Sequence, residues 1–207
     1  MQQIMVPLDG SEFSEQALGW AYAIAGRTGA RIHLVKVQAP DPLTAEAFFF
    51  NVQAETASRS ADQSYLDSIG AQHENVSVVT ALLQGRVVDA LAAYCIGWDI
   101  DLVVMTTHGR GGLSRAWLGS VADELVRRIS IPLMLLRPFP KATMCSTGFN
   151  LDHILIPLDR SEESERAIEP ALEMGQLTGA RYTLVEVVPP LALVPMPEAM
   201  PITMPSK

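Results

Sequence analysis

The chain contains an internal repeat that limits what its two ends can fold into. Residues 4–40 align without a gap to residues 154–190, at an offset of 150 positions, with 18 identities in 37. Each copy opens with an apolar run that ends in Pro-Leu-Asp, and each carries Thr-Gly-Ala-Arg before a second apolar run. Apolar runs on either side of a stretch with helical spacing predict strand, helix and strand in both copies.

The first copy continues into further alternating elements, whereas the second stops after its strand, helix and strand. Strands that alternate with helices imply a parallel sheet with right-handed crossovers. We expect strands at 4–8, 32–37, 76–83, 102–105 and 132–136, and helices at 11–28, 44–69, 85–97 and 121–129. The predicted organisation is a complete domain at 1–139, a linker at 140–150, a partial second domain at 151–190 and a Pro- and Met-rich tail at 191–207.

A glycine-rich segment, residues 104–121, joins the fourth strand to the last helix of the first copy. Glycine lets the backbone approach a ligand closely, and free N–H groups at a helix start favour an anion. Ser120 is expected to cap that helix, with Asp123 and Glu124 in its first turn. The segment therefore suggests a phosphate cradle, although an ordinary strand-to-helix connection with turn glycines has the same spacing.

Asp9 comes directly after the first apolar run of the chain. In α/β folds, ligands bind at the carboxyl ends of parallel strands, where a carboxylate can accept hydrogen bonds from ribose hydroxyls. The alternative is that Asp9 belongs to a turn that starts the following helix. The glycine-rich segment favours the nucleotide interpretation.

With these residues the chain resembles the universal stress proteins of the ATP-binding type. That family has an early strand ending in hydrophobic-Pro-x-Asp and a late G-x2-G-x9-G-[S/T] motif. Here the late motif reads Thr106-x2-Gly109-x9-Gly119-Ser120, with threonine in place of the first glycine. The resemblance implies a doubly wound, five-stranded parallel sheet of order 3-2-1-4-5, like that of adenine-nucleotide alpha-hydrolases, beside a partial second copy as in tandem members. That order puts the first and fourth strands side by side.

Carried over position by position, the resemblance implies an ATP site, with or without Mg²⁺. Pro7, Leu8 and Asp9 would border adenine and ribose, Val37 would contact adenine through its backbone, and Met105 and Thr106 would lie beside the ribose and the first phosphate. Gly109, Gly119, Ser120 and Val121 would surround the phosphates, and Arg110 is a nearby cation for their charge. Family members usually dimerise through the fifth strand, here residues 132–136.

Composition and missing motifs exclude several classes of function. The chain has no G-x4-G-K-[S/T] and no early G-x-G-x-x-G, so neither a P-loop nor an NAD fingerprint is present. A formal charge of −8 and a pI near 4.9 disfavour nonspecific binding to nucleic acid or an anionic membrane. No apolar run approaches the ~20 residues that span a bilayer. Cys95 is expected to be a buried apolar residue, and we expect a cytoplasmic protein.

Three functions fit the sequence. The first is a stress-response regulator that binds an adenine nucleotide, with no enzymatic activity and with an unknown protein as its partner. The second is a slow ATPase or self-phosphorylating protein, with Ser114 or Ser120 as acceptor. The third is a dimeric interaction protein in which the Cβ of Thr106 has closed the nucleotide site. In the second copy Asp159 repeats Asp9 without a glycine-rich segment, so it is expected to be either a relic of the duplication or a structural residue. Three successive phenylalanines, residues 48–50, suggest mixed core and loop packing or a partner surface.

Overall fold

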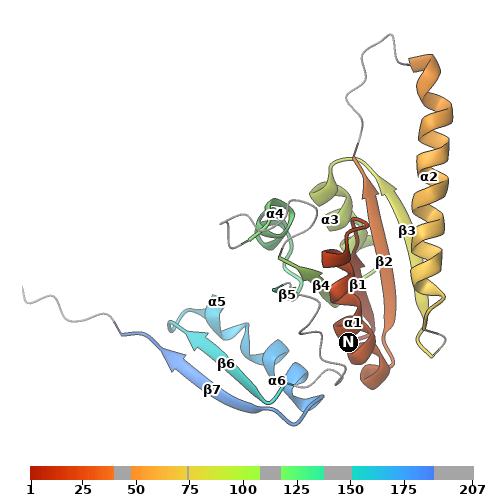
Figure 1. Cartoon of the computed structure of the whole chain (residues 1–207). Helices are drawn as coiled ribbons and strands as arrows, with labels where there is room; N and C mark the ends of the chain where they lie inside the picture. Colours follow the sequence, from red (N-terminus) through yellow and green to blue (C-terminus); the bar gives the residue numbers. More distant parts are fainter. Residues whose placement is uncertain (40–47, 74, 108–117, 138–150, 189–207) are drawn as a thin grey trace, which may run out of the picture.

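The computed structural model describes residues 1–39, 48–73, 75–107, 118–137 and 151–188, without the side chains of 48–55 (Figure 1). The first copy folds as β1 (Gln3–Pro7), α1 (Glu12–Thr28), β2 (Arg31–Gln38), α2 (Phe48–Gly70), β3 (Val78–Gln84), α3 (Val87–Gly97), β4 (Leu102–Thr106), α4 (Ser120–Arg128) and β5 (Leu133–Leu136). The second copy folds as β6 (His153–Leu158), α5 (Glu162–Glu165), α6 (Ile168–Gln176) and β7 (Arg181–Glu186). The expected start of α2 at residue 44, the side chains of residues 48–50, the linker and the tail from 191 onward lie outside this description.

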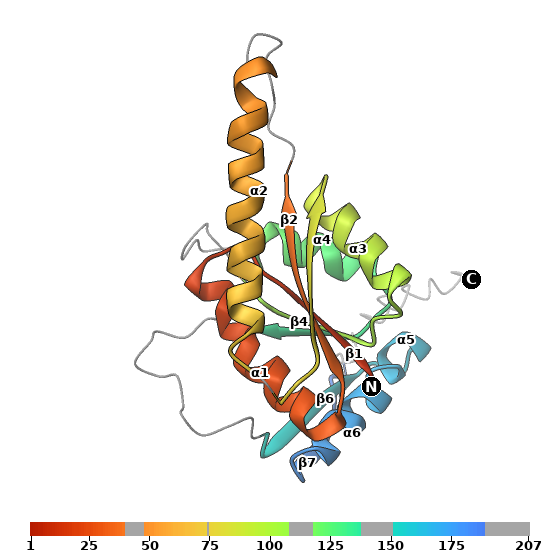
Figure 2. The same ribbon diagram turned by 90° about the vertical axis from the view of Figure 1, so that its right-hand side faces the viewer.

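The first copy forms one parallel sheet of order β3-β2-β1-β4-β5, which confirms the predicted topology. Helices α1 and α2 cover one face of this sheet, and α3 and α4 cover the other (Figure 2). The first turns of α2 extend past the carboxyl end of β2 (Figure 2). From β1 the chain adds β2 and then β3 on one side, and it then crosses over to add β4 and β5 on the other side. The neighbouring strands β1 and β4 are therefore the topological switch point of the fold.

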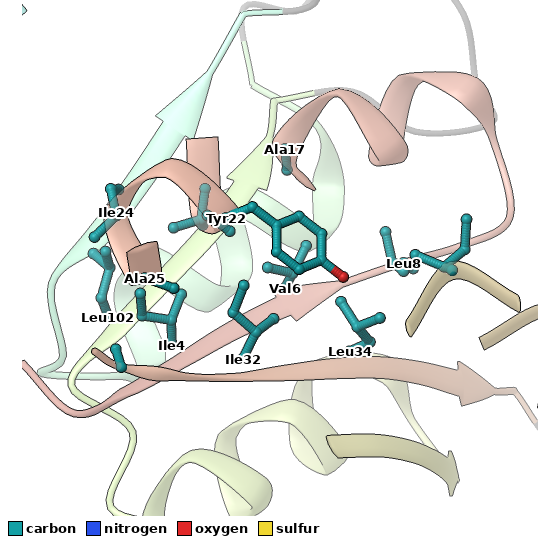
Figure 3. Close-up of a cluster of buried hydrophobic side chains, with 14 of the residues drawn as sticks. Ile4, Val6, Leu8, Ala17, Tyr22, Ile24, Ala25, Ile32, Leu34 and Leu102 are labelled. Atoms are coloured by element: carbon teal, nitrogen blue, oxygen red, sulfur yellow. The ribbon is translucent and has the colours of Figure 1, made fainter. Parts of the chain in front are cut away.

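Each face of the sheet has its own apolar core. Under α1 and α2, the apolar side chains of Ile4, Val6, Ile32 and Leu34 are fully buried, and Tyr22 of α1 lies over them (Figure 3). The opposite face buries Met5, Val35 and Val103 against α3 and α4. The alternation of side chains along each strand produces this division, because successive residues point to opposite faces.

Two groups on the α3 side of the sheet, a cysteine and a histidine, are buried away from solvent. Cys95 contacts the sulfur of Met5, and burial raises the pKa of its thiol to about 11, as expected for an inert apolar cysteine. His33 of β2 is fully buried between the Tyr94 hydroxyl at 2.9 Å and Gln3 Oε1 at 2.8 Å. Burial, with a further contribution from the charge of Arg31, lowers the pKa of His33, so the neutral ring is favoured.

The second copy forms only a two-stranded parallel sheet, β6–β7, with α5 and α6 against it. One continuous helix is expected there, as in α1, but the structure has two. Pro170 is the cause, since it has no N–H to donate to the carbonyl of Arg166 and its ring clashes with that carbonyl. The helix therefore restarts at Ile168, so that Pro170 falls in the first turn of α6, where an N–H has no acceptor in the helix.

The second copy packs partly on the first. Leu151, Met174 and Leu177 lie against the core under α1 and α2. Leu155 and Leu184 of its sheet remain 58% and 61% exposed, whereas their counterparts in the repeat, Met5 and Leu34, are fully buried. The first domain therefore covers part of the apolar surface of the partial domain and leaves much of this two-stranded sheet in water.

Candidate functional site

The strands β1 and β4 pair over a short distance only. Their recorded ladder joins Ile4 to Leu102 and Met5 to Val103. Beyond these pairs β1 continues along β2 as far as the pair of Pro7 with Val35. On the other side, β4 continues along β5 to the end of both strands. The described carboxyl end of β1 is thus paired with β2, and that of β4 is paired with β5. The predicted site lies where β1 and β4 diverge.

Asp9, one residue beyond the buried Leu8, is held in place from several directions. Its Oδ1 accepts hydrogen bonds from the Ser11 amide at 2.9 Å and from the Ser11 hydroxyl at 2.6 Å. Its own amide donates to Ser14 Oγ at 3.4 Å, and its carbonyl accepts from Lys36 Nζ at 3.4 Å. Ser11 is also the N-cap of α1, so the turn that starts α1 fixes the direction of the carboxylate. Both interpretations of Asp9, turn residue and site carboxylate, fit this geometry.

The same turn occurs in the second copy. Asp159 Oδ1 accepts from the Ser161 amide at 3.0 Å and from the Ser161 hydroxyl at 2.6 Å, and its amide donates to Ser164 Oγ at 3.3 Å. The bonds from Ser161 lower the pKa of Asp159 to about 2. The carboxylate therefore has a structural role in both copies, and any binding role has to come from its surroundings in the first.

A hydrogen bond joins the two described ends of the glycine-rich segment, Thr107 and Gly119. The Gly119 amide donates to the Thr107 carbonyl at 2.6 Å, and the Thr107 amide donates to the Leu136 carbonyl of β5 at 2.9 Å. Gly119, rather than Ser120, is the N-cap residue of α4, and it makes no side-chain cap bond. Ser120 is instead the exposed first residue of the helix, and Asp123, without Glu124, is the acidic residue of its first turn. The prediction that Ser120 caps α4 is wrong because the helix begins one residue earlier than its apolar pattern indicates.

The start of α4 still offers the backbone N–H groups that an anion requires. The first amides of an α-helix have no acceptor inside the helix, and the N-cap residue Gly119 has no side chain to cap them. The first helical bond runs from Asp123 to the Gly119 carbonyl, so the amides of Ser120 and Val121 precede it. Since the Gly119 amide already bonds to Thr107, these two amides are the better candidates to meet a phosphate.

The predicted site residues divide between the two faces of the sheet. Val37, Met105 and Val121 belong to or pack against the core on the α3 side. Pro7 points to that face as well, because it lies two residues after Met5 in β1. Together these four side chains could form an apolar surface for a purine ring.

Leu8 and Thr106 belong to the other face. Leu8 is buried in the core under α1, and Thr106 follows Leu102 and Val104 in the alternation of β4 and is itself buried. The Cβ of Thr106 thus points away from the apolar side chains on the α3 side. Gly109, Arg110 and Ser114 lie outside the described residues, and their predicted roles remain predictions.

Sequence patterns missed a polar group at the same edge of the sheet. Lys36 of β2 is buried, and its Nζ lies 3.0 Å from Asp62 Oδ1 of α2 in addition to its contact with Asp9. The available signal was a lysine at the position where alternation along β2 places it on the same face as the buried Ile32 and Leu34. Its partner, 26 residues further along an exposed helix, could not be identified from spacing.

Two features are absent from the described residues. In that part of the chain no three or more His, Cys, Asp or Glu side chains gather as they would around a metal ion. Among its helices, none combines the length and apolar character needed to cross a membrane.

The comparisons with known proteins agree on one family. The model of the universal stress protein family matches residues 1–137 and 150–206. A universal stress protein of Thermus aquaticus is 30% identical over 137 residues, which are 65% of this chain and 97% of that protein. A universal stress protein of Mycobacterium tuberculosis is 27% identical over 196 residues, which are 85% of this chain and 59% of that longer protein.

Solved structures show the same fold. A universal stress protein from Archaeoglobus fulgidus superposes with a TM-score of 0.66 at 18% identity, covering 91% of this chain and 68% of that one. The match extends over both copies of the repeat.

Proposed function

Since the chain belongs to the universal stress protein family, we propose that it binds an adenine nucleotide, ATP, at the carboxyl ends of β1 and β4 and acts as a nucleotide-dependent interaction module. The observation that carries this proposal is the carboxylate of Asp9, held by Ser11 at the point where β1 and β4 diverge, with a helix whose N-cap is glycine, α4, following β4 in the chain. A carboxylate suits ribose hydroxyls, and helix amides suit phosphates.

In this proposal each part of the site has a defined task. Asp9 accepts hydrogen bonds from the ribose, and the amides of Ser120 and Val121 donate to phosphate oxygens. Val37 contacts adenine through its backbone, and Met105 lies beside the ribose. Mg²⁺ would neutralise phosphate charge when it accompanies the nucleotide. Because the Cβ of Thr106 points into the other face, we propose that the threonine leaves the nucleotide site open.

The geometry supports binding more than catalysis. In this proposal both oxygens of the Asp9 carboxylate are occupied, Oδ1 by Ser11 and the other by the ribose, so the carboxylate does not serve as the base that accepts a proton from an attacking water. We therefore propose a binder that is not an enzyme. Self-phosphorylation at Ser120 remains the alternative because its side chain is exposed at the start of α4. Transfer of labelled phosphate from ATP that is lost in Ser120→Ala would establish it.

A dimer through β5 is part of the proposal. Residues Leu133–Leu136 form the edge strand of the main sheet, and all four are half-buried. An apolar edge with unpaired backbone groups is suited to pairing with the same strand of a second chain. Sedimentation should show a monomer–dimer equilibrium, and a monomer at all concentrations would contradict this part.

A cytoplasmic location also remains part of the proposal, in keeping with the free, buried Cys95 thiol.

Gly119→Val tests the nucleotide site. Gly119 has φ −69° and ψ 154°, which valine adopts readily, so the variant should fold while its branched side chain crowds the start of α4. We expect Mg-ATP affinity to fall by more than about tenfold, or about 1.4 kcal/mol, in isothermal titration. Gly26→Val is the matched control because nothing lies within 4 Å of an added Cβ there. Equal affinity of Gly119→Val and the control would favour a nucleotide-free interaction protein.

A further inference from the structure

Lys36 is the buried cation nearest to Asp9 among the described residues. Its side chain is 10% exposed, its Nζ lies 3.0 Å from Asp62 Oδ1, and it donates to the Asp9 carbonyl at 3.4 Å. The ammonium also lies 5.1 Å from the centre of the Tyr65 ring. A buried charge is stable only when it is paired and hydrogen-bonded, so these partners define where Lys36 can be.

These contacts join three elements at one edge of the sheet. Gln38 Nε2 donates to Asp62 Oδ2 at 2.7 Å, which holds the second oxygen of the carboxylate against the end of β2. The Tyr65 hydroxyl donates to Glu15 Oε1 of α1 at 2.9 Å. A displacement of α2 would therefore disturb Lys36 and, through it, the main chain of Asp9.

The repeat shows that Asp9 does not need a lysine for its local turn. In the second copy Glu186 occupies the position of Lys36, and it pairs with Arg160, the counterpart of Gly10, at 2.6 Å. The Asp159 turn nevertheless has the same bonds to Ser161 as the Asp9 turn has to Ser11. The described part of the second copy contains no counterpart of α2. The buried lysine is thus found in the copy that has α2, and the aspartate turn forms without it in the other copy.

We propose that Lys36 is a positioning residue that ties the Asp9 turn to Asp62 of α2, so that nucleotide binding and the anchoring of α2 strengthen each other. This inference rests on the proposed nucleotide site. Coupling of this kind is reciprocal, because a contact that favours the nucleotide-bound turn is itself favoured by the nucleotide. The segment of α2 from residue 56 to 61 is exposed, so a change in its anchoring would reach the surface of the protein.

The test combines isothermal titration with hydrogen exchange of α2. We expect saturating Mg-ATP to slow amide exchange in residues 58–70 of the wild type about threefold or more. Lys36→Met should raise the Kd about tenfold and abolish this slowing even when the site is saturated. Lys36→Arg, which keeps the charge, should restore part of both. Arg31→Met removes an exposed cation from the opposite end of β2 and should behave as the wild type.

A second variant separates positioning from stability. Lys36→Met alone leaves Asp62 partly buried beside an apolar side chain, whereas Lys36→Met with Asp62→Leu removes both charges of the pair. The double variant should fold, bind more weakly and show no response of α2. If it binds as the wild type and α2 still responds, Lys36 is not a positioning residue. If the wild type itself binds no Mg-ATP, the proposed function fails, and this inference fails with it.

Discussion

Asp9→Ala is expected to weaken Mg-ATP binding about 10- to 100-fold, which corresponds to the loss of a hydrogen bond with a charged group at about 1.5–3 kcal/mol. Asp159→Ala should leave affinity unchanged. The two carboxylates make the same bonds to Ser11 and Ser161, so both variants lose equivalent support at the start of a helix. The difference in affinity between them, measured by isothermal titration, isolates what Asp9 does for the ligand.

Asp9→Asn refines this comparison. Asparagine has one acceptor oxygen, which cannot serve Ser11 and a ribose hydroxyl as well as two carboxylate oxygens can. The variant should therefore keep the α1 turn and still bind more weakly. If Asp9→Ala and Asp159→Ala both bind as the wild type, Asp9 has only the structural role that Asp159 has.

Leu34→Ala should destabilise the protein by about 2–5 kcal/mol, the usual cost of removing a fully buried leucine side chain. Leu184→Ala, at the same position of the repeat, should change the free energy of unfolding by no more than about 0.5 kcal/mol. The reason is burial, since Leu34 is fully buried beneath α1 and α2, whereas Leu184 is 61% exposed. The shift in denaturant midpoint at constant slope, followed by circular dichroism, measures both changes.

The stability comparison also tests whether the partial domain is open in solution. A cost for Leu184→Ala as large as that for Leu34→Ala would mean that another molecule covers β7. Repeating the unfolding at two protein concentrations would identify that molecule as a second copy of the chain if the midpoint moved with concentration.

Sequence patterns predicted the main sheet well because β1 and β4 are apolar runs buried on both faces, and β2 has buried Ile, Leu and Val side chains along both of its faces. Their order came from the family resemblance, since apolar runs alone do not state which strands are neighbours. The helix expected at 11–28 also agrees with α1 to within one residue, and the structure has Ser11 as its N-cap and Gly29 as a left-handed C-cap with φ 73°.

Other features depended on local chemistry or on distant contacts. Pro170 is visible in the sequence, but the strong similarity of the two copies favoured one continuous helix over the break that proline imposes. The start of α4 differs by one residue because Gly119 bonds to Thr107, a contact between residues twelve positions apart. The pairing of Lys36 with Asp62 needed the folded chain, since nothing in either segment specifies the other.

Titration of the wild-type chain with Mg-ATP tests the central claim most directly. We predict saturable binding of one nucleotide per chain, because the first copy has both the Asp9 turn and α4 with its glycine N-cap, and the described part of the second copy has only the turn. A stoichiometry of two would contradict the assignment of the site to β1, β4 and α4. Absence of heat, with no nucleotide released from the purified protein by acid, would contradict nucleotide binding itself.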